Sequence, residues 1–473
     1  MLKNLLSFSA VGLLPYLINF LILPLYSEHI SPEEFGIVGL LMSAVIIASS
    51  WTGLQFSSAL SRYFFDYEGE QLKVFTSTVL FSVIVVSLLF CSIYSALIYF
   101  GLFSRFFEGI SAGVMYISVF LVFLSILNTV FERLLINEQL GHIVLIRSIL
   151  SQLLSVCVGM YLILYCDMSY VGFLISSVVY YSCLVLFSLK YCRHYLVNSY
   201  NVHYAGLAAK YSIPLILHAL GGVLFMYSTT FFIESFLTLS LVGLFFIVDK
   251  FTQILKAIVN SINNVLMPIY NRRAKIKPGG GVEFIESILP AWFLFINILI
   301  INFSAVAQSF MITYMGSEYE GLLFLILILS LAYLFRGLYC FCMAPIFFHK
   351  RTSLVPKITL ATGILSLPIN YLLVSRFGFT GAALAVFSVF FVNFLLSLSA
   401  SKTVEVINFN FKYLALMMAV VTCINSPVFF LVNSGFLTVL ITCIMQSIVT
   451  ILIVYRFNLF NVRKSLDSLR AYQ

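Results

Sequence analysis

Residues 238–273 read TLSLVGLFFIVDKFTQILKAIVNSINNVLMPIYNRR. At about 100° per residue, a helix over this stretch gathers its polar side chains into one stripe within roughly 60° of Asp249. The stripe, with Lys250 at its flank, consists of Asp249, Gln253, Lys256, Asn260, Asn263 and Asn264. The remaining faces are mostly Leu, Ile, Val and Phe. We therefore predict one long helix that runs into a basic loop and turns a single polar stripe away from an apolar medium.

The composition identifies that medium as a lipid bilayer. Hydrophobic residues make up 62% of the 473 residues and charged residues 9%, whereas soluble domains contain about 25% charged residues. A soluble core cannot bury so much apolar surface. The chain is therefore predicted to be an all-α polytopic membrane protein. The nine cysteines form no CxxC pair and lie mostly in apolar segments, which is typical of free, buried thiols.

Apolar segments long enough to cross a bilayer recur along the chain, and we count about fourteen transmembrane helices. They cover residues 5–26, 36–60, 73–100, 112–136, 142–165, 169–191, 206–232, 238–268, 284–311, 319–346, 354–375, 380–401, 411–432 and 435–456. The first run is longer than the apolar part of a signal peptide, and no small-x-small cleavage site follows it. We interpret it as a retained first span.

The positions of Lys and Arg predict the orientation. With the N-terminus in the cytoplasm, the outer connections hold only Arg105 and Arg376, and most other basic residues fall in the inner ones. This positive-inside pattern predicts that both termini are cytoplasmic. The net charge of +8 thus reflects topology, and no nucleic-acid partner is expected.

No connection between the spans is long enough to fold into a domain. The longest are residues 192–205 and 270–281. Any chemistry must therefore take place inside the helix bundle, which disfavours membrane polymerases, ligases and glycosyltransferases. The sequence also contains no P-loop, no HExxH and no zinc-ligand spacing, so we predict no ATP site and no metal site.

Weak internal repeats predict two lobes. The matched positions are Arg147 with Lys357 and Tyr161 with Tyr371, both 210 residues apart, Gly172 with Gly381, 209 apart, and Gly36 with Gly243, 207 apart. The near-constant offset predicts two six-helix lobes in the same orientation. The predicted parts are residues 1–191, a cytoplasmic linker at 192–205, residues 206–401, and a final part at 402–473 with two additional helices and a cytoplasmic tail.

Charges inside the membrane are candidate functional residues, because a charge at mid-bilayer costs several kcal/mol unless it faces water or a partner. Counted from the outer end of its helix, Asp249 lies about 16 Å deep and Lys256 about 27 Å deep. Arg336 lies in span 319–346, His218 in span 206–232, and Arg62 follows span 36–60. The structural alternatives are that Lys256 snorkels to the inner surface, that Asp249 and Arg336 form buried ion pairs, that His218 is a hydrogen-bonded structural residue, and that Arg62 is an ordinary interfacial charge.

Several stretches carry a family resemblance. Residues 23–36 read LPLYSEHISPEEFG, and Gly53, Ser61 and Arg62 follow them; residues 242–250 run on towards Pro268; and residues 380–383 read TGAA. In these stretches, which fall within about residues 1–400, the chain resembles the polysaccharide and O-antigen flippases (Wzx-like). That family belongs to the MOP superfamily, which also includes MATE exporters and lipid II flippases.

The resemblance implies a MATE-like fold in which two six-helix lobes enclose a cavity that opens alternately to the two sides, with two further C-terminal helices. The implied cargo is an undecaprenyl-pyrophosphate-linked oligosaccharide that moves from the cytoplasmic to the periplasmic leaflet of the bacterial inner membrane. Membrane lipids and the polysaccharide polymerase machinery are implied partners.

The candidate residues fit such a cargo. Cations for the pyrophosphate are expected from Lys250, Lys256, Arg336 and Arg62, and amides for the sugars from Asn260, Asn263 and Asn264. Asp249 and His218 are the candidates for ion coupling, driven by a proton or sodium gradient with no bound cofactor. The alternatives are a MATE-type cation-coupled exporter, whose cavity should be acidic, and a membrane O-antigen polymerase, which the short outer loops disfavour.

Overall fold

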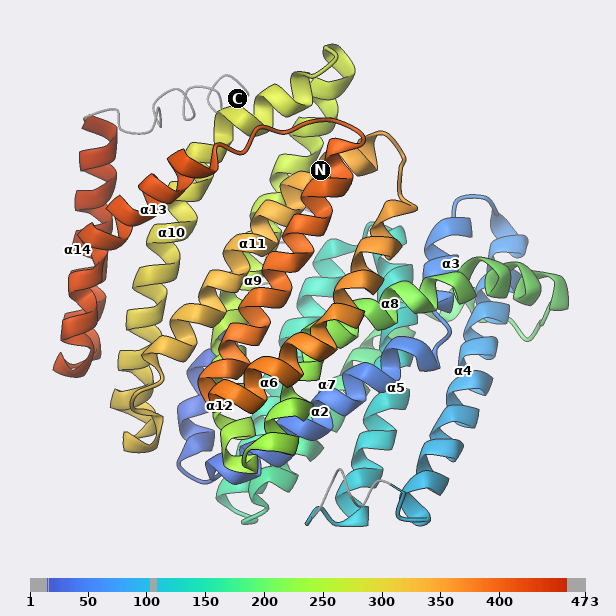
Figure 1. The fold of residues 1–473 in the computed structure, drawn as a ribbon. Coiled ribbons are helices and arrows are strands. Elements are labelled where there is room, and N and C mark those ends of the chain that lie inside the picture. Colours follow the sequence, from blue (N-terminus) through green and yellow to red (C-terminus); the bar gives the residue numbers. More distant parts are fainter. Residues whose placement is uncertain (1–14, 16, 103–108, 457–473) are drawn as a thin grey trace. The chain divides into compact units, whose positions relative to one another are not determined.

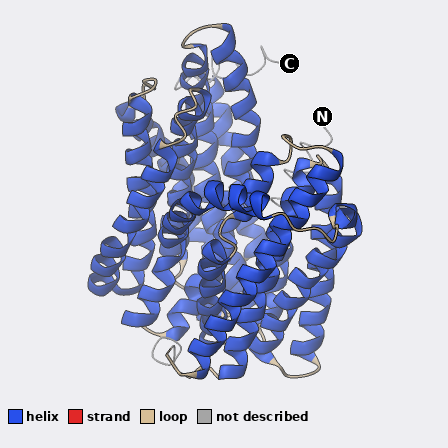
Figure 2. Ribbon diagram, turned by 90° about the vertical axis from the view of Figure 1, so that its right-hand side faces the viewer, coloured by secondary structure: helices blue, strands red, loops and turns tan. Residues whose placement is uncertain are grey.

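The computed structural model describes residues 15, 17–102 and 109–456, with the side chains of residues 264 and 265 excepted (Figure 1). Within those ranges the regular elements are all helices (Figure 2). Eleven of them are long and apolar enough to cross a membrane, which confirms the all-α polytopic class. Helix α9 carries three charges near its middle and is not among the eleven, and α12 joins two predicted spans. Of the first predicted span, residues 5–14 and 16 lie outside the described part.

After a short helix over Leu17–Ser27, the chain forms a series of helices joined by brief turns. These are α2 (Pro32–Thr52), α3 (Phe56–Tyr63), α4 (Gly69–Tyr99), α5 (Ala112–Asn137), α6 (Gly141–Leu164), α7 (Ser169–Cys192), η1 (Arg193–Tyr195), α8 (Val202–Phe236), α9 (Leu239–Ile276), α10 (Gly280–Met315), η2 (Ser317–Tyr319), α11 (Leu323–Phe348), α12 (Leu354–Lys402), α13 (Phe411–Asn425), η3 (Ser426–Ser434) and α14 (Phe436–Arg456).

By packing, the chain divides into two compact units. Unit 1 comprises residues 1–247 and 359–379, and unit 2 comprises residues 248–358 and 380–473. Helices α9 and α12 thus each contribute to both units. The two lobes inferred from the internal repeat, residues 1–191 and 206–401, stay a prediction. The units are defined by which residues pack together, whereas the lobes are defined by matching positions in the sequence.

In unit 1, α5, α6 and α7 pack together, and α2, α3 and α4 pack against α5 and α8. The core between them includes Phe75 and Leu121, both fully buried. Helix α2 starts at a capping box: the Ser31 hydroxyl accepts from the backbone N–H of Glu34, and the Glu34 carboxylate accepts from that of Ser31. The Ser-Pro-Glu-Glu run therefore sets a helix start by local chemistry.

In unit 2, α10 packs against α11, α13 and α14. One core cluster of this unit joins residues of α9, α10, α11 and α13, among them Leu255, Trp292, Phe341 and Met417. A polar contact crosses the apolar interface of α10 with the last helices: the Asn302 amide donates to Ser447 Oγ at 2.9 Å. Such a bond stabilises helix association in lipid, where an unpaired amide is costly.

The structure corrects two predicted segments and confirms a pair of others. Span 36–60 is broken, because α2 ends at Thr52, and Leu54 and Gln55 have positive φ before α3 begins. The basic segment 270–281 is not a long loop, because α9 continues to Ile276 and α10 begins at Gly280. Spans 354–375 and 380–401 are confirmed as two helical segments, because the non-helical backbone of Gly378, where φ is 59°, interrupts α12 between them.

Candidate functional site

The polar stripe of α9 forms as its spacing predicts. Gln253 Nε2 donates a 2.7 Å hydrogen bond to Asp249 Oδ2, one turn away on the same face. Neighbouring residues on the other faces, among them Phe251 and Leu255, are fully buried. Asp249 and Lys256 are both half-buried. The carboxylate is therefore held on a polar strip of an otherwise apolar helix.

Helix α11 brings a further cation to this strip. Arg336 lies close enough to Lys256 for a direct electrostatic interaction, and Lys256 also interacts with Asp249 and Lys250. The backbone beside Arg336 is fixed by close packing, because a Cβ at Gly337 would lie 2.1 Å from the indole ring of Trp292 on α10. Three cations and one carboxylate thus occupy one region of unit 2, which we call the α9–α11 charge cluster (Asp249, Lys250, Lys256 and Arg336).

Two N–H groups near this cluster lack an acceptor among the described residues. They are Arg336 Nε and Trp292 Nε1, and both atoms are buried. A buried donor without a partner costs about 1–3 kcal/mol. An oxyanion supplies several acceptors at once, so the surplus of cations and free donors suits an anionic ligand.

Of the predicted amides, Asn263 contacts the Cys340 thiol of α11, and Asn260 is half-buried. The side chain of Asn264 lies outside the described residues. Trp292 was not singled out from the sequence, although it is one of only two tryptophans in the chain. Trp292 is flanked in the sequence by apolar residues, as a residue of an ordinary hydrophobic core would be. Only the packing of α10 on α11 shows that its ring lies against Gly337, next to Arg336.

His218 and Arg62 belong to unit 1. His218 is half-buried on α8, and its Nδ1 has no hydrogen-bond partner in the described ranges. Arg62 is exposed on α3, where it forms an ion pair of 2.9 Å with Asp66 and lies over the Tyr63 ring at 5.3 Å. Each unit therefore holds its own subset of the predicted site residues.

A buried arginine that pairs with a half-exposed glutamate in unit 1 was not predicted from the sequence, in which Arg147 is named only as a position of the internal repeat. Arg147 is only 2% exposed. Its guanidinium donates to Asn128 Oδ1 at 3.0 Å, to Ser188 Oγ at 2.6 Å and to Glu132 Oε2 at 3.1 Å. The available signal was the i, i+4 spacing of Asn128 and Glu132, which places both on one face of α5. Arg147 thus ties α5, α6 and α7 together.

No group of three or more His, Cys, Asp or Glu side chains with the geometry of a metal site occurs in the part of the chain that the structure covers.

The fold is similar to solved transporters of the MOP superfamily. The lipid II flippase MurJ in an inward closed conformation matches with a TM-score of 0.75 at 14% identity, over 96% of this chain and 99% of that chain. An inward-facing multidrug resistance MATE family transporter matches with a TM-score of 0.65 at 14% identity, over 83% and 95%. A MOP superfamily transporter from Pyrococcus furiosus matches with a TM-score of 0.60 at 14% identity, over 85% and 95%. At this identity the likeness shows the fold.

A comparison with curated protein sequences finds no significant match. The family model described as polysaccharide biosynthesis protein matches residues 1–273. That match includes the capping box at the start of α2 and nearly all of α9, and it spans more than half of the 473 residues. The chain is a multi-pass membrane protein, and it belongs to the polysaccharide biosynthesis protein family.

Proposed function

We propose that the protein is a flippase that moves an undecaprenyl-pyrophosphate-linked oligosaccharide from the cytoplasmic to the periplasmic leaflet of the bacterial inner membrane. Membership of a polysaccharide biosynthesis family supports a polysaccharide precursor as cargo. The MOP fold supports a transporter that opens alternately to the two sides. A lipid carrier suits this fold, because its tail can remain in the bilayer while the polar headgroup crosses within the protein.

The observation that carries the proposal is the sign of the α9–α11 charge cluster. Lys250, Lys256 and Arg336 outnumber the single carboxylate of Asp249, and two buried N–H donors nearby, on Arg336 and Trp292, lack acceptors among the described residues. A pyrophosphate carries negative charge and many acceptor oxygens, so it satisfies both needs. A cavity for cationic drugs would need the opposite excess of carboxylates.

Asp249 is the proposed site of ion coupling. A carboxylate inside a membrane helix can bind a proton or a sodium ion, and its occupancy would change the charge that Lys256 and Arg336 experience. Loading of Asp249 on one side and release on the other would then drive the return of the empty carrier. His218 in unit 1 is a second proposed proton site.

The test is a flipping assay in vesicles that contain the purified protein and a fluorescent prenyl-pyrophosphate-linked oligosaccharide. A membrane-impermeant reductant added outside bleaches only the outer-leaflet substrate, so the extra bleaching over time reports flipping. Lys256→Ala and Arg336→Ala should each lower the rate by about 10-fold or more, because a hydrogen bond to a charged group contributes about 1.5–3 kcal/mol. Lys357→Ala, which removes an exposed cation of α12, is the matched control.

Equal rates for wild type, Lys256→Ala and Arg336→Ala would refute the anion-binding role. Absence of protein-dependent flipping, together with gradient-driven export of a cationic dye, would favour a MATE-type exporter instead. In cells, loss of the gene should leave lipid-linked oligosaccharide in the cytoplasmic leaflet.

A further inference from the structure

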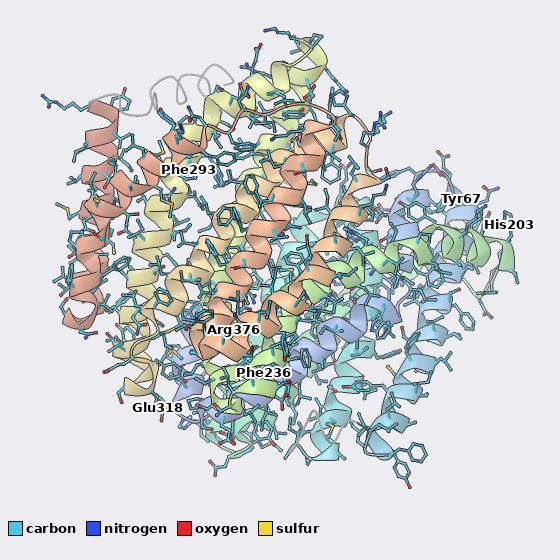
Figure 3. The ribbon with its side chains drawn as sticks, viewed as in Figure 1. Tyr67, His203, Phe236, Phe293, Glu318 and Arg376 are labelled. Carbon is cyan, nitrogen blue, oxygen red and sulfur yellow. The ribbon has the colours of Figure 1, made fainter. Side chains whose placement is uncertain are left out.

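A compact group of aromatic rings lies where the turn between α3 and α4 meets the start of α8, within unit 1. The Tyr67 ring centroid is 5.0 Å from that of Tyr204 and 5.1 Å from that of Phe75. Figure 3 shows Tyr67 and His203, the neighbour of Tyr204, at the same end of the unit. The contact joins residues more than a hundred positions apart in the chain.

Two further tyrosines extend this group. The Tyr63 ring of α3 lies 5.8 Å from Phe75 and 5.8 Å from Tyr211 of α8. We call Tyr63, Tyr67, Tyr204 and Tyr211 the tyrosine cluster. Phe75 is fully buried beneath it and serves as its floor. The cluster is therefore a packed platform built from three segments.

The hydroxyl groups of the cluster are available to a ligand. None of the four phenol oxygens hydrogen-bonds to another group in the described part of the chain. The four side chains are half-buried or exposed, so their polar ends reach solvent. Burial, and then Tyr204, Tyr63 and Asp66, raise the pKa of Tyr67, so that its hydroxyl stays a neutral donor at physiological pH.

Charged groups lie against the Tyr63 ring of the platform. Arg62 lies over the Tyr63 ring at 5.3 Å and pairs with Asp66. Tyrosines of a membrane-interface belt anchor a protein one by one, with their rings against lipid. Here the rings pack on one another and on Phe75, beside an ion pair. Aromatic faces with hydroxyls and charged groups at their rim match a pyranose, whose C–H face is apolar and whose edge carries hydroxyls.

We propose that the tyrosine cluster is a binding site for the oligosaccharide part of the substrate before translocation. This inference rests on the proposed flippase function. The charge distribution predicts that this end of unit 1 is cytoplasmic, because Arg62, Lys73 and Lys210 fall in inner segments. A newly assembled lipid-linked oligosaccharide is displayed on that side. In this proposal unit 1 binds the sugar part of the substrate, and the pyrophosphate is bound by the α9–α11 charge cluster.

Two soluble probes separate the two parts of the substrate. One is the oligosaccharide released by mild acid from the lipid-linked intermediates of the source cell, and the other is geranyl diphosphate. Binding of each to the purified full-length protein is measured by calorimetry. Tyr67→Ala and Tyr204→Ala should weaken oligosaccharide binding by about 10-fold, which corresponds to loss of one aromatic contact. Binding of geranyl diphosphate should not change.

The chain offers a matched control in the same unit. Tyr161 of α6 and Tyr165, which directly follows that helix, stack with centroids 5.8 Å apart and are 59% and 79% exposed. Tyr161→Ala and Tyr165→Ala remove comparable exposed rings outside the cluster and should leave oligosaccharide binding unchanged. Tyr204→Trp preserves an aromatic face, and Tyr67→Phe removes only a hydroxyl. These two variants should bind the oligosaccharide within about threefold of wild type, since a neutral hydrogen bond contributes little in net terms.

The outcomes distinguish the proposed oligosaccharide site from the proposed flippase function. Unchanged oligosaccharide affinity in Tyr67→Ala and Tyr204→Ala would overturn the site. So would a wild-type protein that binds geranyl diphosphate but not the oligosaccharide, although the flippase proposal would survive. Binding of neither probe would count against both. If the alanine variants melt at lower temperature than wild type, the oligosaccharide affinities of Tyr204→Leu and Tyr204→Trp are compared instead. Both variants retain an apolar side chain, but only Tyr204→Trp retains an aromatic ring, so equal affinities would overturn the site.

Discussion

Gly36 of α2 and Gly243 of α9 meet with their backbones in direct contact. A Cβ at Gly243 would lie 1.8 Å from the carbonyl oxygen of Pro32 and 2.7 Å from the backbone nitrogen of Gly36. A Cβ at Gly36 would lie 2.0 Å from the carbonyl oxygen of Leu239. These two glycines also occupy matching positions of the internal repeat, 207 residues apart. The two helices cross within unit 1 at a point where neither can carry a side chain.

The first prediction concerns this crossing. Gly36→Ala and Gly243→Ala should each lower the melting temperature of the detergent-purified protein, because the added methyl meets backbone rather than a movable side chain. Overpacking of this kind costs about 1–3 kcal/mol. Gly206→Ala in α8 is the control, since nothing lies within 4 Å of its Cβ position. A melting temperature for Gly243→Ala equal to that of Gly206→Ala would contradict the crossing.

The second prediction concerns Arg147. Arg147→Ala should lower the free energy of unfolding by about 1–3 kcal/mol, because the buried Asn128 and Ser188 lose their donor, whereas the half-exposed Glu132 can be hydrated. Arg147→Lys should recover part of the loss, since lysine retains the charge but not the planar fork. Arg133→Ala, at an exposed position one residue from Glu132, should behave as wild type in thermal melting. A melting curve for Arg147→Ala that coincides with that of Arg133→Ala would show that the contacts of Arg147 are dispensable for stability.

A third prediction separates coupling from folding at Asp249. Asparagine can still accept the hydrogen bond that Gln253 donates, so Asp249→Asn should keep the fold and lose only the titratable charge. We expect flipping by this variant to ignore an imposed proton or sodium gradient that accelerates the wild type. Glu318→Gln removes an exposed carboxylate of η2 and should retain the response. Full gradient dependence in Asp249→Asn would remove Asp249 from the coupling mechanism.

The fourth prediction is a pH dependence of stability. The Tyr270 hydroxyl at the end of α9 donates to Glu405 at 2.8 Å, and His349 contacts the same carboxylate at 3.0 Å. Burial and then the bond to Glu405 raise the pKa of Tyr270 above its usual value. A raised folded pKa contributes stability that is complete below the unfolded pKa of about 10 and declines above it. Melting of wild type and Tyr270→Phe from pH 7 to 11 checks this.

Tyr270→Phe should be less stable by about 1 kcal/mol at pH 7, and the difference from wild type should shrink above pH 10 or so. A difference that stays constant across this range would mean that the hydroxyl makes no proton-linked contribution. Tyr314→Phe, at an exposed position near the end of α10, controls for general effects of tyrosine ionisation.

The all-α membrane class and the positions of most helices follow from the sequence, because hydropathy and span length are local properties. The α9 stripe follows as well: the i, i+4 spacing of Asp249 and Gln253 fixes their contact in any helix. Sequence reasoning failed at backbone breaks. The positive φ of Leu54 and Gln55 separates α3 from α2, and no glycine or proline stands at those two positions to signal it.

Tertiary structure alone decided which distant groups meet. Arg336 approaches Lys256 and the Trp292 ring covers Gly337 because α9, α10 and α11 pack side by side. Arg147 became a buried tie because α5 and α7 close around it. The sequence by itself determined which polar and apolar side chains share a face of each helix, since helical periodicity and hydropathy depend only on neighbours along the chain. The sequence of one helix does not determine which face of a neighbouring helix it contacts. That pairing depends on how side chains from separate helices pack together in the folded protein.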